Sequence, residues 1–232
     1  MTSCRLVIAD DHPLFRDALR VTIAQTFVDA EIVEADSFDS LRARLEAASE
    51  TDLILLDLNM PGVRGLSGLL YLRAAFSAVP VVIISANEEP RVMRLTLDLG
   101  AVGYIPKSAT PGEIRAALSA LLAGEMWLPA VLERPRSADA ADATLAAALS
   151  GLTPQQVRVL MMLSDGLLNK QIAHLLEVTE ATVKAHVSAI LQKLGVDNRT
   201  QAVIVARRLA DEWGTTRHDI ASASRIDRRS RQ

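Results

Sequence analysis

The chain has 232 residues, half of them hydrophobic, and its 28 acidic and 25 basic side chains give a net charge of −3. The hydrophobic fraction excludes a wholly disordered protein, and the single cysteine, Cys4, excludes a disulfide scaffold. The longest uncharged apolar run, residues 78–86, is far shorter than the roughly 18 residues of a membrane-spanning helix, and no signal peptide precedes the first apolar run. We therefore expect a soluble cytoplasmic protein with no membrane partner.

The charge is distributed unevenly along the chain. Residues 1–149 carry 13 basic and 20 acidic side chains, whereas residues 150–232 carry 12 basic and 8 acidic ones. An acidic front and a basic back indicate different partners at the two ends, with nucleic acid a candidate for the back.

The front half alternates short apolar runs with helical patterns. Continuous apolar runs, rather than strict alternation, are typical of parallel strands buried on both faces. We therefore predict a doubly wound α/β domain of the flavodoxin-like kind, with a five-stranded parallel sheet. The predicted strands are residues 6–9, 31–35, 53–56, 81–84 and 102–105, and the predicted helices are 13–25, 37–47, 65–75, 90–99 and 111–123.

Polar side chains follow four of the five predicted strands. Asp10 and Asp11 follow the first, Asp57 the third, Ser85 the fourth and Lys107 the fifth. Ligands of such folds bind at the carboxyl ends of the strands. Clustered carboxylates suit octahedral Mg²⁺, and a carboxylate can accept a phosphoryl group when a cation and a hydroxyl stand nearby.

The back half is helical. Residues 129–150 are rich in Ala, Ser and Pro and are interpreted as a linker, with a helix near its end. Four helices are predicted at residues 154–164, 169–176, 180–194 and 200–211, and the polar, basic end of the chain is expected to be disordered.

The predicted helix 180–194 has an apolar stripe that begins at Val183 and an opposite face of small or polar side chains. A short turn at residues 177–179 separates it from the helix before. This is the plan of a helix-turn-helix, although any small helical bundle would give the same periodicity.

The front half resembles the receiver domain of two-component response regulators. The resemblance covers about residues 4–124. It rests on ADDHPLFR at residues 9–16, LDLNMPG at 56–62 with Gly65, SA at 85–86, and GAVGYIPK at 100–107.

The receiver resemblance implies a role for each matching residue. Asp57 is the expected phosphoacceptor, and Mg²⁺ is the expected cofactor. His12 is interpreted as a loop residue rather than a metal ligand, because no second His or Cys accompanies it. The implied cation ligands are Asp10, Asp11, Asp57 and the backbone carbonyl of Asn59, and the implied phosphoryl-binding and switch residues are Ser85, Lys107 and Tyr104, the last turning inward on activation.

The back half resembles the LuxR-type DNA-binding domain over about residues 150–211. The matching segments are LTP at residues 152–154, GLLNKQIA at 166–173, TVKAH at 182–186 and KLGVDNRTQA at 193–202. Leu168 stands where the family usually has a capping Ser, so we expect Asn169 to cap instead. The resemblance implies base contacts from Lys184, Ala185 and Ser188, and phosphate contacts from Lys170, Lys193, Arg199 and Thr200.

Together the two halves resemble the NarL/FixJ class of response regulators. We expect a receiver domain at residues 1–128, a linker at 129–150, a four-helix DNA-binding domain at 151–212 and a tail at 213–232. The implied function is transcription control through phosphorylation of Asp57 by a sensor histidine kinase. The implied partners are that kinase and double-stranded DNA, with RNA polymerase a further candidate, and the protein is not expected to be an enzyme.

Two alternatives from other classes are weighed against this function. A phosphatase of the haloacid dehalogenase type also uses an aspartate and Mg²⁺, but it needs a second Asp where this chain has Asn59. The other alternative is a constitutive DNA binder whose receiver is only a scaffold.

The active form is expected to be a homodimer. The receiver face around Arg94, Leu95 and Tyr104 is one predicted pairing surface. The last helix is the other, because its apolar residues exceed what one inward stripe requires. Those residues are Ala202, Val203, Val205, Ala206 and Leu209.

Overall fold

The computed structural model describes residues 4–47, 50–132 and 140–209. Its first part is a five-stranded parallel sheet in the order β2-β1-β3-β6-β7. This order confirms the predicted doubly wound domain. The strands are β1 Arg5–Ala9, β2 Glu31–Ala35, β3 Leu53–Asp57, β6 Val81–Ser85 and β7 Gly103–Pro106.

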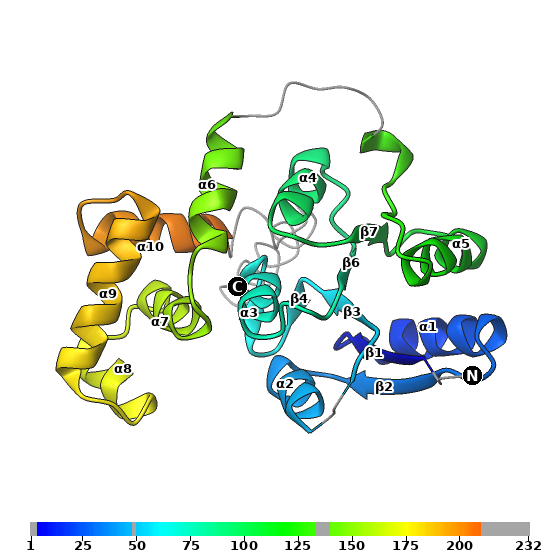
Figure 1. The fold of residues 1–232 in the computed structure, drawn as a ribbon, viewed down its shortest axis with the longest axis horizontal. Coiled ribbons are helices and arrows are strands. Elements are labelled where there is room, and N and C mark those ends of the chain that lie inside the picture. Colours follow the sequence, from blue (N-terminus) through cyan, green and yellow to red (C-terminus); the bar gives the residue numbers. More distant parts are fainter. Residues whose placement is uncertain (1–3, 48–49, 133–139, 210–232) are drawn as a thin grey trace, which may run out of the picture.

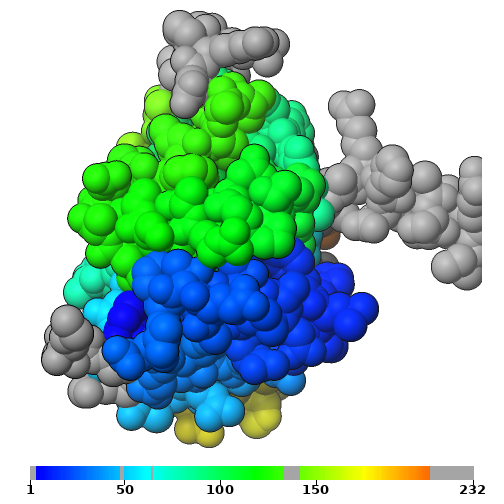
Figure 2. Space-filling view, turned by 90° about the vertical axis from the view of Figure 1, so that its right-hand side faces the viewer, coloured from blue at the N-terminus to red at the C-terminus, as the bar shows by residue number. Residues whose placement is uncertain are grey.

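Helices cover both faces of this sheet (Figure 1). On one face α1 and α5 pack against the apolar side chains of the strands, and Figure 2 shows these helices side by side at the surface. The other face is covered by α2, α3 and α4. The helices are α1 Pro13–Thr26, α2 Phe38–Glu46, α3 Ser67–Ala75, α4 Pro90–Asp98 and α5 Pro111–Leu122.

The sequence patterns did not predict three small features in and just after this domain. A short antiparallel hairpin, β4 Asn59–Met60 with β5 Val63–Arg64, follows the strand that ends at Asp57. Beyond α5, Trp127 pairs with Gly103 as an isolated parallel bridge, and the 3₁₀ turn η1 Ala130–Leu132 packs near α4. An added Cβ at Gly103 would stand 2.9 Å from the carbonyl oxygen of Trp127, so this close approach requires glycine.

The second part of the chain is helical. Linker helix α6 Ala140–Ser150 precedes the four helices α7 Pro154–Ser164, α8 Asn169–Leu175, α9 Glu180–Leu194 and α10 Arg199–Arg207. The hydroxyl of Thr179 caps α9 by accepting from the backbone N–H of Thr182, and Gly195 ends it in a left-handed conformation at φ 64°. The predicted tail at residues 213–232 lies outside the described residues.

The expected cap of α8 is wrong. Asn169 is already the first residue of α8, and Leu168, at the capping position, offers no side-chain acceptor. The side chain of Gln171 instead accepts from the backbone N–H of Leu168 at 2.7 Å, while the Asn169 side chain accepts from Arg199. The backbone N–H of Leu168, which has no acceptor within the helix backbone, is thus satisfied by a side chain from the first turn of the same helix.

One hydrophobic core runs through both parts of the chain. The buried residues on the α2, α3 and α4 face of the sheet are continuous with those of the C-terminal helices. Figure 1 shows α6 beside α4 and α7 beside α3. The structure therefore holds the two parts together through apolar packing. Within the described residues, no helix is long and apolar enough to span a membrane.

Candidate functional site

The polar residues that follow the strands meet at one edge of the sheet. Asp57 ends β3 and pairs in register with Ile84, the residue before Ser85. Asp10 follows β1, and its backbone N–H donates to the carbonyl of Ala35. Asp10 and Asp57 are buried, with 1% and 3% of their surface exposed. Two buried carboxylates this close require positive charge between them.

Lys107 supplies part of that charge. Its Nζ atom lies 2.8 Å from Asp10 Oδ2 and 2.8 Å from Asp57 Oδ2, and 5.0 Å above the ring centre of Phe15. Burial raises the pKa of Asp57, and the contact with Lys107 only partly offsets it. Burial alone would lower the pKa of Lys107, but its close contacts with the carboxylates of Asp10 and Asp57 together raise it. One lysine thus leaves the carboxylates short of positive charge.

The remaining oxygen atoms fit a hard divalent cation. Asp10 Oδ2 and Asp11 Oδ1 are buried and accept no hydrogen bond of good geometry, although Lys107 and His12 lie at ion-pair distance from them. Asp10, Asp11, His12 and Asp57 each offer a ligand atom, and these atoms lie within 4.8 Å of one another. Carboxylate oxygens are the donors that Mg²⁺ and other hard cations prefer. The pocket is therefore compatible with a divalent metal.

His12 lies in the loop between β1 and α1, as predicted, and its ring reaches the acidic cluster. Its Nδ1 atom lies 2.8 Å from Asp11 Oδ1, 3.2 Å from Asp10 Oδ1 and 3.9 Å from Asp57 Oδ2. The sequence feature that could have predicted this placement is the position of His12 between the acidic pair and Pro13. A residue before proline is restricted to extended backbone, and His12 has φ −90° and ψ 104° at the start of α1.

Ser85, Asn87 and Tyr104 form a buried polar chain beside the acidic cluster. The Ser85 hydroxyl accepts from the backbone N–H of Asn87 at 3.1 Å, and the Tyr104 hydroxyl donates to the Asn87 carbonyl. Tyr104 is fully buried, and burial raises the pKa of its hydroxyl. It was expected to turn inward on activation, but it already points inward here. The Asn87 backbone, in the loop before α4, thus links Ser85 to Tyr104.

The base-reading face predicted on α9 is open to solvent. Val183 and Ile190 are buried against the other helices, whereas Lys184, Ala185 and Ser188 are exposed. The receiver part of the chain does not cover these three side chains. The contact between the two parts thus leaves the α9 face accessible.

The four residues expected to contact phosphates differ in what they touch. Lys170 and Thr200 are exposed. Lys193 donates from Nζ to the carbonyl of Gly151 and to the side chain of Gln156, both at 2.7 Å. Arg199 donates to Asn169 and to the carbonyl of Leu167. Lys193 and Arg199 therefore join helices within their own domain, and their contacts with DNA stay predictions.

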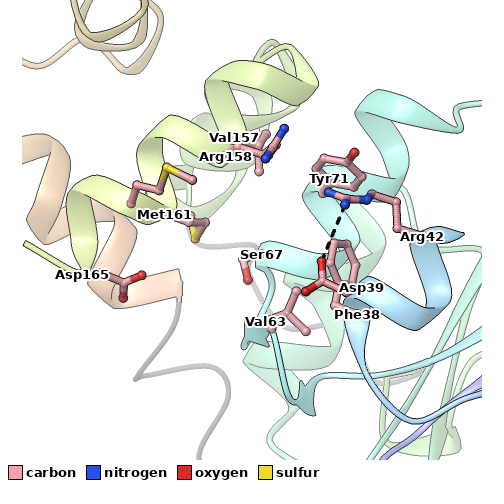
Figure 3. Close-up of a pocket in the computed structure, with 12 residues that line it drawn as sticks. Phe38, Asp39, Arg42, Val63, Ser67, Tyr71, Val157, Arg158, Met161 and Asp165 are labelled. Atoms are coloured by element: carbon pink, nitrogen blue, oxygen red, sulfur yellow. Dashed lines mark ion pairs between the residues drawn. The ribbon is translucent and has the colours of Figure 1, made fainter. Parts of the chain in front are cut away.

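The two parts of the chain enclose a cleft of about 260 Å³. Figure 3 shows Phe38, Val63 and Tyr71 on the receiver side, facing Val157, Arg158 and Met161 of α7. The rings of Phe38 and Tyr71 pack edge to face at 5.4 Å. Away from the cleft, the backbone N–H of Leu66 donates to the carbonyl of Leu209 at 3.1 Å.

The structure buries part of each expected pairing surface, while Arg94 on the receiver and Val203 and Val205 on α10 stay partly exposed. Leu95 and Tyr104 are buried, so they offer no surface on the receiver. On α10 and the turn after it, Ala202, Ala206 and Leu209 are fully buried, because this segment packs against α7, α9 and the loop at Leu66. The excess apolar residues therefore face a second set of neighbours within the same chain. Ile204 remains 55% exposed.

Two protein families match the chain. The family described as response regulator receiver domain matches residues 6–119, and the family described as bacterial regulatory proteins, luxR family, matches residues 150–206. Neither is the haloacid dehalogenase type that was weighed as an alternative. The two matches together cover most of the described residues.

Curated relatives share this arrangement along nearly their whole length. The chain is 41% identical over 208 residues to a glycerol metabolism activator of Pseudomonas putida, covering 87% of this chain and 94% of the relative. It is 34% identical over 201 residues to the nitrate/nitrite response regulator protein NarL of Escherichia coli K12, covering 86% and 93%.

A solved structure shows the same fold. The two-component response regulator RcsB in complex with DNA aligns with a TM-score of 0.54 at 24% identity, covering 90% of this chain and 99% of that one. The isolated receiver domain of RcsB from Salmonella enterica serovar Typhimurium, at 25% identity, covers 57% of this chain with a TM-score of 0.53.

Proposed function

Because the chain belongs to the transcriptional response regulators of the NarL/FixJ class, we propose that Asp57 accepts the phosphoryl group by which a sensor histidine kinase controls its DNA binding. The observation that carries this proposal is the contact of Lys107 Nζ with both Asp57 Oδ2 and Asp10 Oδ2 at 2.8 Å. A buried carboxylate that contacts a lysine and lies beside further carboxylates is arranged to react with a phosphoryl group rather than to stabilise the core.

The chemistry follows from the groups at the strand ends. An Asp57 oxygen attacks the phosphorus of the kinase phosphohistidine, so that an O–P bond forms as the N–P bond breaks. Lys107 balances the charge on the phosphoryl oxygens, and Ser85 offers a hydroxyl to them. Mg²⁺, held by Asp10, Asp11, Asp57 and the Asn59 carbonyl, supplies further positive charge to those oxygens when bound.

The signal leaves the site through the loop between β6 and α4. Asn87 lies in this loop and its backbone N–H donates to Ser85 at the end of β6, while the Tyr104 hydroxyl donates to the Asn87 carbonyl. Because α4 packs against linker helix α6, a shift of Ser85 toward the phosphoryl group changes the surface on which α6 rests. Phosphorylation then loosens the contact between receiver and DNA-binding domain.

The output is binding to double-stranded DNA as a homodimer, with the α9 face in the major groove. Lys184, Ala185 and Ser188 face solvent and read bases, while Lys170, Thr200, Lys193 and Arg199 lie nearer the phosphates. A single copy contacts few base pairs, so pairing raises avidity through effective concentration. Contact with RNA polymerase is the further step by which this DNA binding would control transcription.

Incubation with Mg²⁺ and acetyl phosphate tests the proposal. We expect the intact mass to rise by one phosphoryl group, which base removes, and we expect Asp57→Ala to prevent it. A phosphorylated Asp57→Ala variant would refute the assignment of Asp57. Equal DNA affinity of the phosphorylated and unphosphorylated wild type would favour the constitutive DNA binder instead.

A further inference from the structure

The chain crosses the outer edge of the receiver sheet just after α5. Residues 125–132, here called the strap, run from the end of α5 past β7 to α4 (Figure 1). Trp127 packs against the hydrophobic cluster on the α1 and α5 face of the sheet, whereas Leu132, in η1, packs against the cluster on the opposite face. The strap thus passes around the β7 edge and is anchored on each face of the sheet.

The strap takes up the backbone groups on the outer side of β7. The backbone N–H of Tyr104 donates to the carbonyl of Trp127 at 3.2 Å, and the backbone N–H of Trp127 donates to the carbonyl of Val102 at 3.4 Å. Alternate residues of a strand direct their backbone groups to the same side, and Pro106, the next residue on that side, has no N–H. Tyr104 therefore offers the last backbone donor on the outer side of β7, and the strap accepts from it.

This contact is short and weakly bonded. Trp127 forms an isolated bridge with Gly103 rather than a strand, and both of its backbone hydrogen bonds are longer than the usual length of about 2.9–3.0 Å. The strap also exposes three large apolar side chains, those of Met126, Leu128 and Val131. A segment with one bridge and few buried apolar side chains opens at a small fraction of the global unfolding free energy. The strap can therefore leave the edge while the sheet stays folded.

The β7 strand leads directly to the phosphorylation site. Lys107 follows the last residue of β7, and its backbone N–H donates to the carbonyl of Ser85 at 2.8 Å. Its Nζ atom contacts Asp57 Oδ2 at 2.8 Å. A phosphoryl group on Asp57 adds three oxygens where this contact now lies, so the Lys107 side chain has to move. The backbone of β7 connects that movement to Tyr104 and hence to the strap.

We propose that the strap is an autoinhibitory contact that phosphorylation releases. It holds the start of the linker against the β7 edge until phosphorylation of Asp57 separates Trp127 from Tyr104. Residues 125–132 then add to the length of the linker, so the DNA-binding domain can move farther from the receiver and pair on DNA. The inference rests on the proposed function, because phosphorylation of Asp57 is its trigger.

Amide hydrogen exchange of the full-length chain measures the strap bond directly. We expect the Tyr104 amide to exchange about tenfold faster once Mg²⁺ and acetyl phosphate have phosphorylated the protein, because its acceptor is lost. In a Trp213→Phe background, which leaves Trp127 as the single tryptophan, acrylamide should quench the fluorescence more strongly under the same conditions. Asp57→Ala should show neither change.

The intact mass and the DNA affinity separate this inference from the proposed function. If the mass rises by one phosphoryl group and DNA binding tightens while Tyr104 stays protected and Trp127 stays shielded, the proposed function stands and the strap is refuted. If the mass does not rise, the proposed function fails, and a variant that needs no phosphoryl group decides the strap.

Gly103→Ala is that variant. The added Cβ would stand 2.9 Å from the carbonyl oxygen of Trp127, so the strap has to move away. We expect about tenfold faster exchange of Tyr104 and a DNA affinity of the unphosphorylated variant that approaches the affinity of the phosphorylated wild type. Gly112→Ala is the matched control in the first turn of α5. Its Cβ would make only ordinary contacts, so neither quantity should change.

Two results with Gly103→Ala would contradict the inference. One is a folded variant in which Tyr104 exchanges as slowly as in the wild type. The other is faster exchange of Tyr104 with the DNA affinity of the unphosphorylated wild type. Trp127→Leu removes the ring that anchors the strap and gives the same test if Gly103→Ala does not fold.

Discussion

The guanidinium of Arg91 and the carboxylate of Asp142 form a two-pronged ion pair that joins receiver helix α4 to linker helix α6. Arg91 Nε lies 2.6 Å from Asp142 Oδ2, and a second guanidinium nitrogen lies 2.8 Å from Oδ1. The side chain of Asp142 is only 11% exposed. The hydrogen bond from Arg91 holds the pKa of Asp142 below its ordinary value of 3.8. This pair lies on the proposed path from the phosphorylation site to the DNA-binding domain.

We predict that Asp142→Asn loosens the contact between the two domains and lowers the free energy of unfolding by about 1 kcal/mol. Because the folded-state pKa is depressed, the stabilisation is present above about pH 4 and is lost as the pH falls through the folded value. Small-angle scattering should show a larger radius of gyration. Asp197→Asn, on an exposed residue of the DNA-binding domain, is the control.

The charge swap Arg91→Asp with Asp142→Arg should restore part of the compaction that each single variant loses. If the double variant has a radius of gyration as large as that of Asp142→Asn, the ion pair does not hold the two domains together. Apolar packing alone would then account for the contact.

Replacing Lys107 by Met should raise the pKa of Asp57 further, because the contact with Lys107 lowers it more than the backbone hydrogen bond from Asn59 does. Fewer Asp57 side chains are then ionised at a given pH, so the rate of labelling by acetyl phosphate should shift toward higher pH. Carboxyl ¹³C NMR follows the titration of Asp57, and Lys170→Met serves as the control. An Asp57 titration equal to that of the wild type would contradict the role given to Lys107.

Two lysines of α9 should give opposite results. Lys184 is exposed, so Lys184→Ala should leave stability within about 0.5 kcal/mol and cost roughly 1–3 kcal/mol on specific DNA. Lys193 bonds Gly151 and Gln156, so Lys193→Met should lower the unfolding free energy of the DNA-binding domain by about 1–3 kcal/mol. Denaturant unfolding and DNA titration on both variants measure the contrast.

If Lys184→Ala leaves the ratio of specific to nonspecific affinity unchanged, Lys184 contacts phosphates rather than bases. A Lys193→Met variant as stable as the wild type, with a weaker salt dependence of DNA binding, would return Lys193 to the phosphate contacts.

Ile204 is the exposed large apolar residue of α10, and we predict that it lies in the pairing surface. Ile204→Glu should weaken binding to a paired site about one helical turn apart more than binding to a single half-site. Leu175→Glu, at a similarly exposed position of α8, is the matched control. Equal losses on paired and single sites would remove Ile204 from the dimer contact.

The sequence by itself determined the elements and most of the strand-end site. Continuous apolar runs that alternate with helical patterns favour a buried parallel sheet, and parallel strands bring their carboxyl ends to one edge, so Asp57, Ser85 and Lys107 were expected to converge. Only the tertiary structure decided which side chains the neighbouring elements bury. His12 turned toward the carboxylates, Tyr104 turned inward, and Ala202, Ala206 and Leu209 were buried against a second set of neighbours. The spacing of apolar residues along a helix shows which of its faces are apolar. It does not show which other element packs against each face. That choice depends on contacts between residues far apart in the chain, such as Leu66 with Leu209 and Arg91 with Asp142.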